Sequence, residues 1–92
     1  MKPGIYFPTH PGEVLKNEIN SSGSTIQAAA DAIGISRKHL SLVLNGHSGV
    51  SVEIAVRISK VLGHTPEFWL NMQMAWDLSQ IKREEIRVGK LK

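Results

Sequence analysis

Cysteine is absent from this chain of 92 residues. Its absence excludes disulfide bridges, thiolate metal sites and a cysteine nucleophile, and it fits a reducing compartment. The sequence also has no apolar run near the roughly 18 residues that would indicate a membrane-spanning helix. Its first residues lack the charged start, apolar stretch and small-residue cleavage site of a secretory signal. We therefore expect a cytoplasmic protein with no membrane partner.

Internal repeats, low-complexity segments and strand-like alternation of useful length are missing as well. Every strong signal is helical, and a chain of this size supports one modest core. Capping residues predict helix starts, and glycine-containing segments predict the ends. The expected helices start at Thr9 or His10, after Ser24 or Thr25, at Ser36, at Ser51 and at Thr65, and the first four end near Gly23, Gly34, Gly46 and Gly63. The fifth extends toward Ile81.

Positive charge is present but unevenly distributed. The net charge is +3 and the isoelectric point is near 9.5, a range that favours nucleic-acid partners. The bases gather in residues 36–60 and in residues 82–92, whereas residues 1–35 carry a slight negative excess. A mild basic bias also describes an ordinary solvated surface, so charge alone leaves both readings open.

The second and third predicted helices have the spacing of a helix-turn-helix. Ala29 and Ala30 are small enough to let the two helices approach closely, and Gly34 permits the sharp turn between them. At about 100° per residue, Leu40, Val43 and Leu44 fall on one side of the third helix. The opposite side carries Arg37, Lys38, Ser41, Leu42 and Asn45.

This polar stripe is the candidate reading surface for double-stranded DNA. Arginine and lysine suit guanine edges or phosphates, and Leu42 suits a thymine methyl group. The start of the helix at Ser36 suits a phosphate, and Gln27 is placed to hold the DNA backbone. The predicted DNA-binding set is Gln27, Ser36, Arg37, Lys38, Ser41, Leu42 and Asn45. The alternative is an amphipathic helix with a solvated face.

Aromatic and apolar residues on the fifth helix form a second candidate surface. Phe68, Trp69, Met72 and Trp76 have helical spacing, which is typical of a core or of a dimer interface rather than of a ligand pocket. Trp69 and Trp76 are seven residues apart and share a side, which suits an isologous two-fold contact. We predict that these four residues dimerise the chain.

Catalytic and metal sites receive no support from the sequence. The four histidines, His10, His39, His47 and His64, do not have the helical spacing of metal ligands, and no segment resembles a nucleophile elbow. We expect His10 to be a helix cap and the last two to lie in surface loops. The chain is expected not to be an enzyme and to need no cofactor.

Four segments in order resemble a known family. They are Thr9–Leu15, Ile33–Arg37, Leu40 and Ser41 with Leu44–Gly46, and Thr65–Gln73, whereas Leu42 departs from the pattern. Together they resemble the HigA (VapI-like) antitoxins, a branch of the Xre/Cro helix-turn-helix superfamily. The resemblance implies a dimeric repressor of its own operon that neutralises a co-expressed HigB-type toxin, a ribosome-dependent ribonuclease.

We therefore expect an all-α, five-helix, lambda-repressor-like domain over residues 9–81, which includes the dimerisation helix. Residues 1–8 form an irregular arm and residues 82–92 a charged tail. The expected partners are a palindromic operator, a second copy of the chain and a HigB-type toxin. Two alternatives remain: a stand-alone phage-type repressor without a toxin, and a toxin inhibitor whose DNA binding is secondary or lost.

Overall fold

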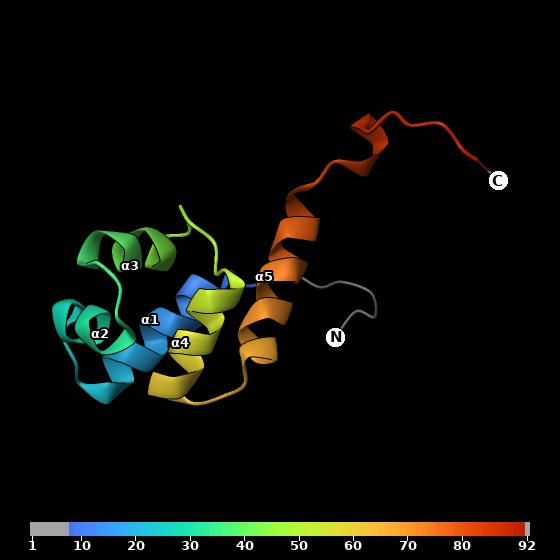
Figure 1. The fold of residues 1–92 in the computed structure, drawn as a ribbon. Helices are drawn as coiled ribbons and strands as arrows, with labels where there is room; N and C mark the ends of the chain where they lie inside the picture. Colours follow the sequence, from blue (N-terminus) through green and yellow to red (C-terminus); the bar gives the residue numbers. More distant parts are fainter. Residues whose placement is uncertain (1–7, 92) are drawn as a thin grey trace, which may run out of the picture.

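The computed structural model describes residues 8–91, and their arrangement is seen in Figure 1. The elements are α1 (Pro11–Ser22), α2 (Ile26–Ile33), α3 (Arg37–Leu44), α4 (Val52–Leu62), α5 (Pro66–Gln80) and the short 3-10 helix η1 (Arg83–Glu85). No strand occurs in this range, so the predicted all-α fold of five helices is confirmed. Nearly all of the expected arm, residues 1–7, lies outside the described residues.

Side-chain caps start the five α-helices where the sequence placed them. The imidazole Nδ1 of His10 accepts a hydrogen bond from the backbone N–H of Gly12 at 2.9 Å. The hydroxyl groups of Thr25, Ser36, Ser51 and Thr65 cap α2, α3, α4 and α5 in the same way. Each cap satisfies a backbone donor that the first helical turn leaves free. The fifth helix ends at Gln80, so Ile81 is its C-cap residue rather than part of the helix.

One core joins the helices. Its completely buried side chains include Leu15 of α1, Leu40 and Val43 of α3, Ile58 of α4 and Trp69 of α5. In Figure 1, α2 and α3 lie on one side of α1 and α4, and α5 stands on the other. Residues after α5 run away from the helices. Within residues 8–91, the helices are too short or too polar to cross a membrane.

Candidate nucleic-acid interface

The turn between α2 and α3 is built on a left-handed glycine. Gly34 has φ of 85°, a conformation that a side chain rarely adopts. Its N–H and that of Ile35 both bind the carbonyl oxygen of Ala30, at 2.8 and 3.1 Å. Ala29 and Ala30 are buried between the helices. These observations confirm the predicted sharp turn and the close packing through small residues.

Arg57 of α4 holds this turn in place, a contact that the sequence analysis missed. Its guanidinium Nη1 donates to the carbonyl oxygen of Ile33 at 3.2 Å, and its Nε donates to Glu53 at 2.9 Å. A Cβ atom at Gly34 would lie only 2.6 Å from Nη1. The four-residue spacing of Glu53 and Arg57 is typical of a helical ion pair. The second partner of Arg57, however, is a backbone oxygen 24 residues away.

The third helix divides its residues as the helical wheel predicts. Leu40, Val43 and Leu44 are buried in the core. On the opposite side Arg37, Lys38 and Asn45 are exposed, Ser41 is half-buried, and Leu42 is 38% exposed. An accessible surface is therefore available for contact with another molecule, with two cationic side chains in the first turn.

The remaining predicted residues surround this stripe. Ser36 caps α3 by accepting from the N–H of His39 at 2.9 Å. At the other end, the amide of Asn45 lies 3.4 Å from the hydroxyl of Ser41. Gln27 is exposed on α2, where its amide donates to Asp31 at 2.9 Å. The structure thus brings six of the seven predicted residues together on α3 or its caps, with Gln27 on the preceding helix.

Two tertiary contacts fix the carboxyl end of α3. Gly12 of α1 approaches the last turn of α3 so closely that a Cβ atom would overlap the carbonyl oxygen of Val43. After α3, the buried Val50 donates its backbone N–H to the side-chain oxygen of Gln73 at 2.7 Å. Gln73 in turn donates to Asp77 at 2.9 Å. Neither contact carries a local sequence signal, because each joins residues from distant elements.

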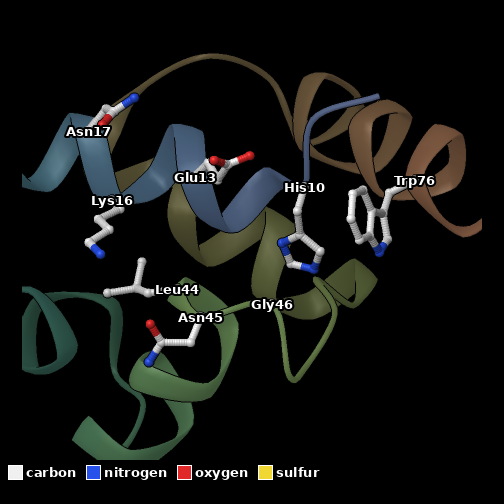
Figure 2. Close-up of a pocket in the computed structure, with 8 residues that line it drawn as sticks. All are labelled: His10, Glu13, Lys16, Asn17, Leu44, Asn45, Gly46 and Trp76. Carbon is white, nitrogen blue, oxygen red and sulfur yellow. The ribbon is translucent and has the colours of Figure 1, made fainter. Parts of the chain in front are cut away.

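A cavity of about 400 Å³ opens beside the same end of α3. Figure 2 shows Lys16 of α1 pointing across this space toward Leu44 and Asn45, while Trp76 of α5 lies next to His10. The rings of His10 and Trp76 meet edge to face, with centroids 5.3 Å apart. Other lining residues are Glu13, Asn17 and Gly46. Three helices therefore meet at the carboxyl end of the candidate reading helix.

Burial lowers the pKa of His10 below its ordinary value, while the carboxylates of Asp77 and Glu13 act in the opposite direction. The neutral ring is also the form whose Nδ1 can accept from Gly12. The prediction of His10 as a cap is therefore confirmed. Among residues 8–91, no three histidine, aspartate or glutamate side chains gather where a metal could bind.

His64 was expected in a surface loop, and it is exposed between α4 and α5 with φ of 63°. It also makes contacts that the sequence did not indicate. Its ring stacks on Phe68 with centroids 4.2 Å apart, and its Nε2 lies 3.1 Å from a carboxylate oxygen of Glu18. The loop is thereby tied to α1 and to the start of α5.

The predicted dimer surface needs a correction at Trp69. This side chain is completely buried within a single copy of the chain, so it has no surface to offer a second one. Trp76, seven residues later, is half-buried and faces His10, while Phe68 and Met72 pack against the core. The spacing predicted that these residues share a side of α5. That side packs against the rest of the molecule, where α5 covers the core.

A different stripe of α5 faces outward. Met74 and Leu78, four residues apart, are about half exposed, whereas Leu70, one turn earlier, is partly buried and packs against the core. Together with Val50 and Val52 at the start of α4 they line a shallow groove, which also contains Ser51, Gln73 and Asp77. The sequence did not indicate this stripe, because α5 is apolar on more than one side and spacing alone did not identify the buried face.

Comparison with known proteins agrees with this architecture. Residues 15–70 match the family model described as helix-turn-helix. Virulence-associated protein A' of Dichelobacter nodosus is 40% identical over 75 residues, which cover 80% of this chain and only 65% of that relative. Antitoxin HigA-1 of Vibrio cholerae is 38% identical over 87 residues, which cover 90% of this chain and 82% of the relative.

A solved structure extends the comparison. The Pseudomonas aeruginosa antitoxin HigA, determined with the higBA promoter, superposes with a TM-score of 0.80 at 25% identity, covering 94% of this chain and all of that one. The family match spans more than half of the chain, and the relationship to antitoxin HigA-1 spans most of both proteins. The chain therefore belongs to the helix-turn-helix family, in the group that includes the HigA antitoxins.

Proposed function

We propose that this protein is a DNA-binding antitoxin, which represses its own operon as a dimer and neutralises a HigB-type ribonuclease toxin. The observation that carries the DNA-binding part is the accessible stripe of α3, held by a capped turn on one end and by α1 and the α3–α4 loop on the other. The toxin partner rests on relatives that are named HigA antitoxins.

In this proposal α3 enters the major groove, which is wide enough to admit a helix. Arg37 and Lys38 contact guanine edges or phosphates, and Leu42 packs against a thymine methyl group. Ser41 and Asn45 continue the same stripe toward the end of the helix. Ser36 and the free N–H groups of the first turn bind a phosphate, and Gln27 contacts the DNA backbone from α2.

Two copies pair through Met74 and Leu78, the exposed apolar residues in the second half of α5. A two-fold contact places the same patch of each copy against the other. The two reading helices would then lie about one helical turn of DNA apart, roughly 34 Å, and contact the two halves of a palindrome.

Replacement of Lys38 tests the reading helix. If the Lys38 side chain contacts a base, we expect Lys38→Ala to weaken operator binding by roughly 1–3 kcal/mol. If it contacts a phosphate, the slope of log K against log salt concentration should fall in magnitude by about one. Lys60→Ala is the matched control, because Lys60 is also exposed but lies on α4. The measurement is binding to the upstream DNA and to scrambled DNA at two salt concentrations. Equal affinities and salt slopes for all three proteins would contradict a DNA contact by Lys38.

Replacement of Met74 tests the dimer surface. Met74 is 57% exposed in the single copy, so Met74→Asp does not disturb the core. In a dimer the new carboxylate would be desolvated without a partner, at a cost of several kcal/mol. We expect the variant to be a monomer by light scattering at micromolar concentration. Trp76→Ala is the control and should remain a dimer, since Trp76 faces His10 of its own copy. A dimer that survives Met74→Asp would refute this surface.

The toxin partner is tested by co-expression with the neighbouring reading frame. Co-purification of a small basic protein, with loss of its ribonuclease activity, is the expected result. Specific operator binding without such a partner would instead identify the protein as a stand-alone repressor.

A further inference from the structure

We propose that the charged C-terminal tail, of which the structure describes residues 82–91, crosses to a second copy of the chain and docks in the groove between the start of α4 and α5 of that copy. This inference deepens the proposed dimer and rests on it. In the dimer each copy would therefore give one tail and receive one.

The tail itself combines exposure with apolar side chains. In Figure 1 it leaves the end of α5 and runs away from the helices. Ile86 is 55% exposed, Val88 is 83% exposed and Leu91 is fully exposed. Burial of three large apolar residues within six positions against another surface would be favourable.

The groove offers a matching apolar surface. Val52 is 68% exposed at the start of α4, and it lies beside Leu70 and Met74 of α5. The lining continues along α5 through Met74 to Leu78, and the tail begins four residues later. In the dimer, α5 of the second copy covers Met74 and Leu78, whereas its tail covers Val52 and Leu70 in the same groove.

Charge favours the same pairing. Helix α5 carries Glu67 and Asp77 and contains no lysine or arginine, and Asp77 lies in the groove. Residues 82–91 carry four bases against Glu84 and Glu85, and both acids lie in η1, so residues 86–91 carry only positive charge. The apolar residues of the tail would pack on the valine and leucine side chains, while its cations face the acidic helix. Phosphate binding would use only the cations and would leave Ile86, Val88 and Leu91 in water.

The tail is long enough for this exchange. Residues 82–91 contain η1 (Arg83–Glu85), which rises about 2 Å per residue, and seven extended residues, so the tail spans up to about 30 Å; the described part of the molecule measures 51 × 33 × 21 Å along its principal axes. The tail of one copy can therefore reach across a contact at α5 to the start of α4 on the other copy.

Disulfide trapping tests the exchange, because the chain contains no cysteine of its own. Two differently tagged full-length copies are co-expressed, one with Val88→Cys and the other with Val52→Cys. Both positions are exposed, so neither change disturbs the core. We expect mild oxidation to link the two copies, since a disulfide forms only when the two Cα atoms lie within about 7 Å. Val88→Cys paired with Ser21→Cys, an exposed position in the last turn of α1, is the control.

A second measurement uses the dimer itself. Val88→Ser should raise the dissociation constant of the dimer by about tenfold to a hundredfold, the effect of one lost valine contact in each of two docking sites. Val61→Ser is the matched control, because Val61 is exposed on the other side of α4.

The outcomes separate this inference from the proposed dimer. Linking of Val52→Cys to Val88→Cys above the control, with a weaker dimer for Val88→Ser, supports tail exchange. A dimer without such a link, or one in which Val88→Cys links only to itself, overturns tail exchange while the α5 contact stands. A wild-type protein that is monomeric overturns both.

Discussion

Replacement of Gly12 by alanine should change the stability of an isolated helix and the stability of the folded protein in opposite directions. Gly12 lies in the first turn of α1. Considered as part of an isolated helix, Gly12→Ala should stabilise the protein by roughly 0.5–1 kcal/mol, since glycine loses more backbone entropy on folding. In the folded protein, however, the new methyl group would overlap the carbonyl oxygen of Val43 and lie 2.9 Å from Nδ1 of His10.

The structural cost outweighs the helical gain. The atom that the methyl group meets belongs to the backbone of α3, which cannot rotate away, so α1 and α3 must separate. Overpacking of this kind costs about 1–3 kcal/mol, and loss of the His10 cap adds about 1 kcal/mol. After subtracting the helical gain, we expect Gly12→Ala to lower the free energy of unfolding by about 2 kcal/mol. For a domain of this size that corresponds to a melting temperature lower by about 10 °C.

Urea unfolding and thermal melts measure this change. Gly89→Ala is the matched control, because a Cβ atom at Gly89 meets nothing within 4 Å. Since α1 supports the end of the reading helix, we also expect Gly12→Ala to weaken operator binding at temperatures where the variant remains folded. An unchanged or higher free energy of unfolding for Gly12→Ala would refute the close approach of α1 and α3.

Two further predictions concern the supports of the same region. Gln73→Ala removes the acceptor for the buried N–H of Val50 and should lower the free energy of unfolding by about 1–3 kcal/mol. Urea unfolding measures the change, with Gln80→Ala at an exposed position as the control. Equal stability of the two variants would contradict a stabilising bond between Val50 and Gln73. The pKa of His10 is lowered in the folded protein, so the folded state binds fewer protons than the unfolded state. The stability from His10 should thus be complete above about pH 6.5 and decline as the pH falls through the lowered pKa. His10→Asn keeps a capping side chain but does not titrate, and an equal loss of stability between pH 7.5 and 5 in both proteins would show that His10 is not the titrating group.

Much of the fold was predictable because its signals are local. Thr25, Ser36 and Thr65 cap helices through the nearest backbone N–H groups, and a cap depends on residues only two or three positions away. The glycine turn at Gly34 and the division of α3 into a buried and an exposed side follow from backbone conformation and helical periodicity. These features depend on neighbours in the sequence, so the sequence alone determined the helix-turn-helix and the stripe that includes Arg37 and Lys38.

Only the tertiary structure decided how those local elements are held and which way they face. The bond from Arg57 to Ile33 and the bond from Val50 to Gln73 join residues 24 and 23 positions apart, a separation that no periodic pattern encodes. The same is true of Gly12 against Val43. For α5, apolar residues on several sides left two possible buried faces, and Trp69 was assigned to a dimer surface when it belongs to the core. Which side of an apolar helix is buried depends on the shape of the core that receives it, and that shape exists only once the other helices have packed.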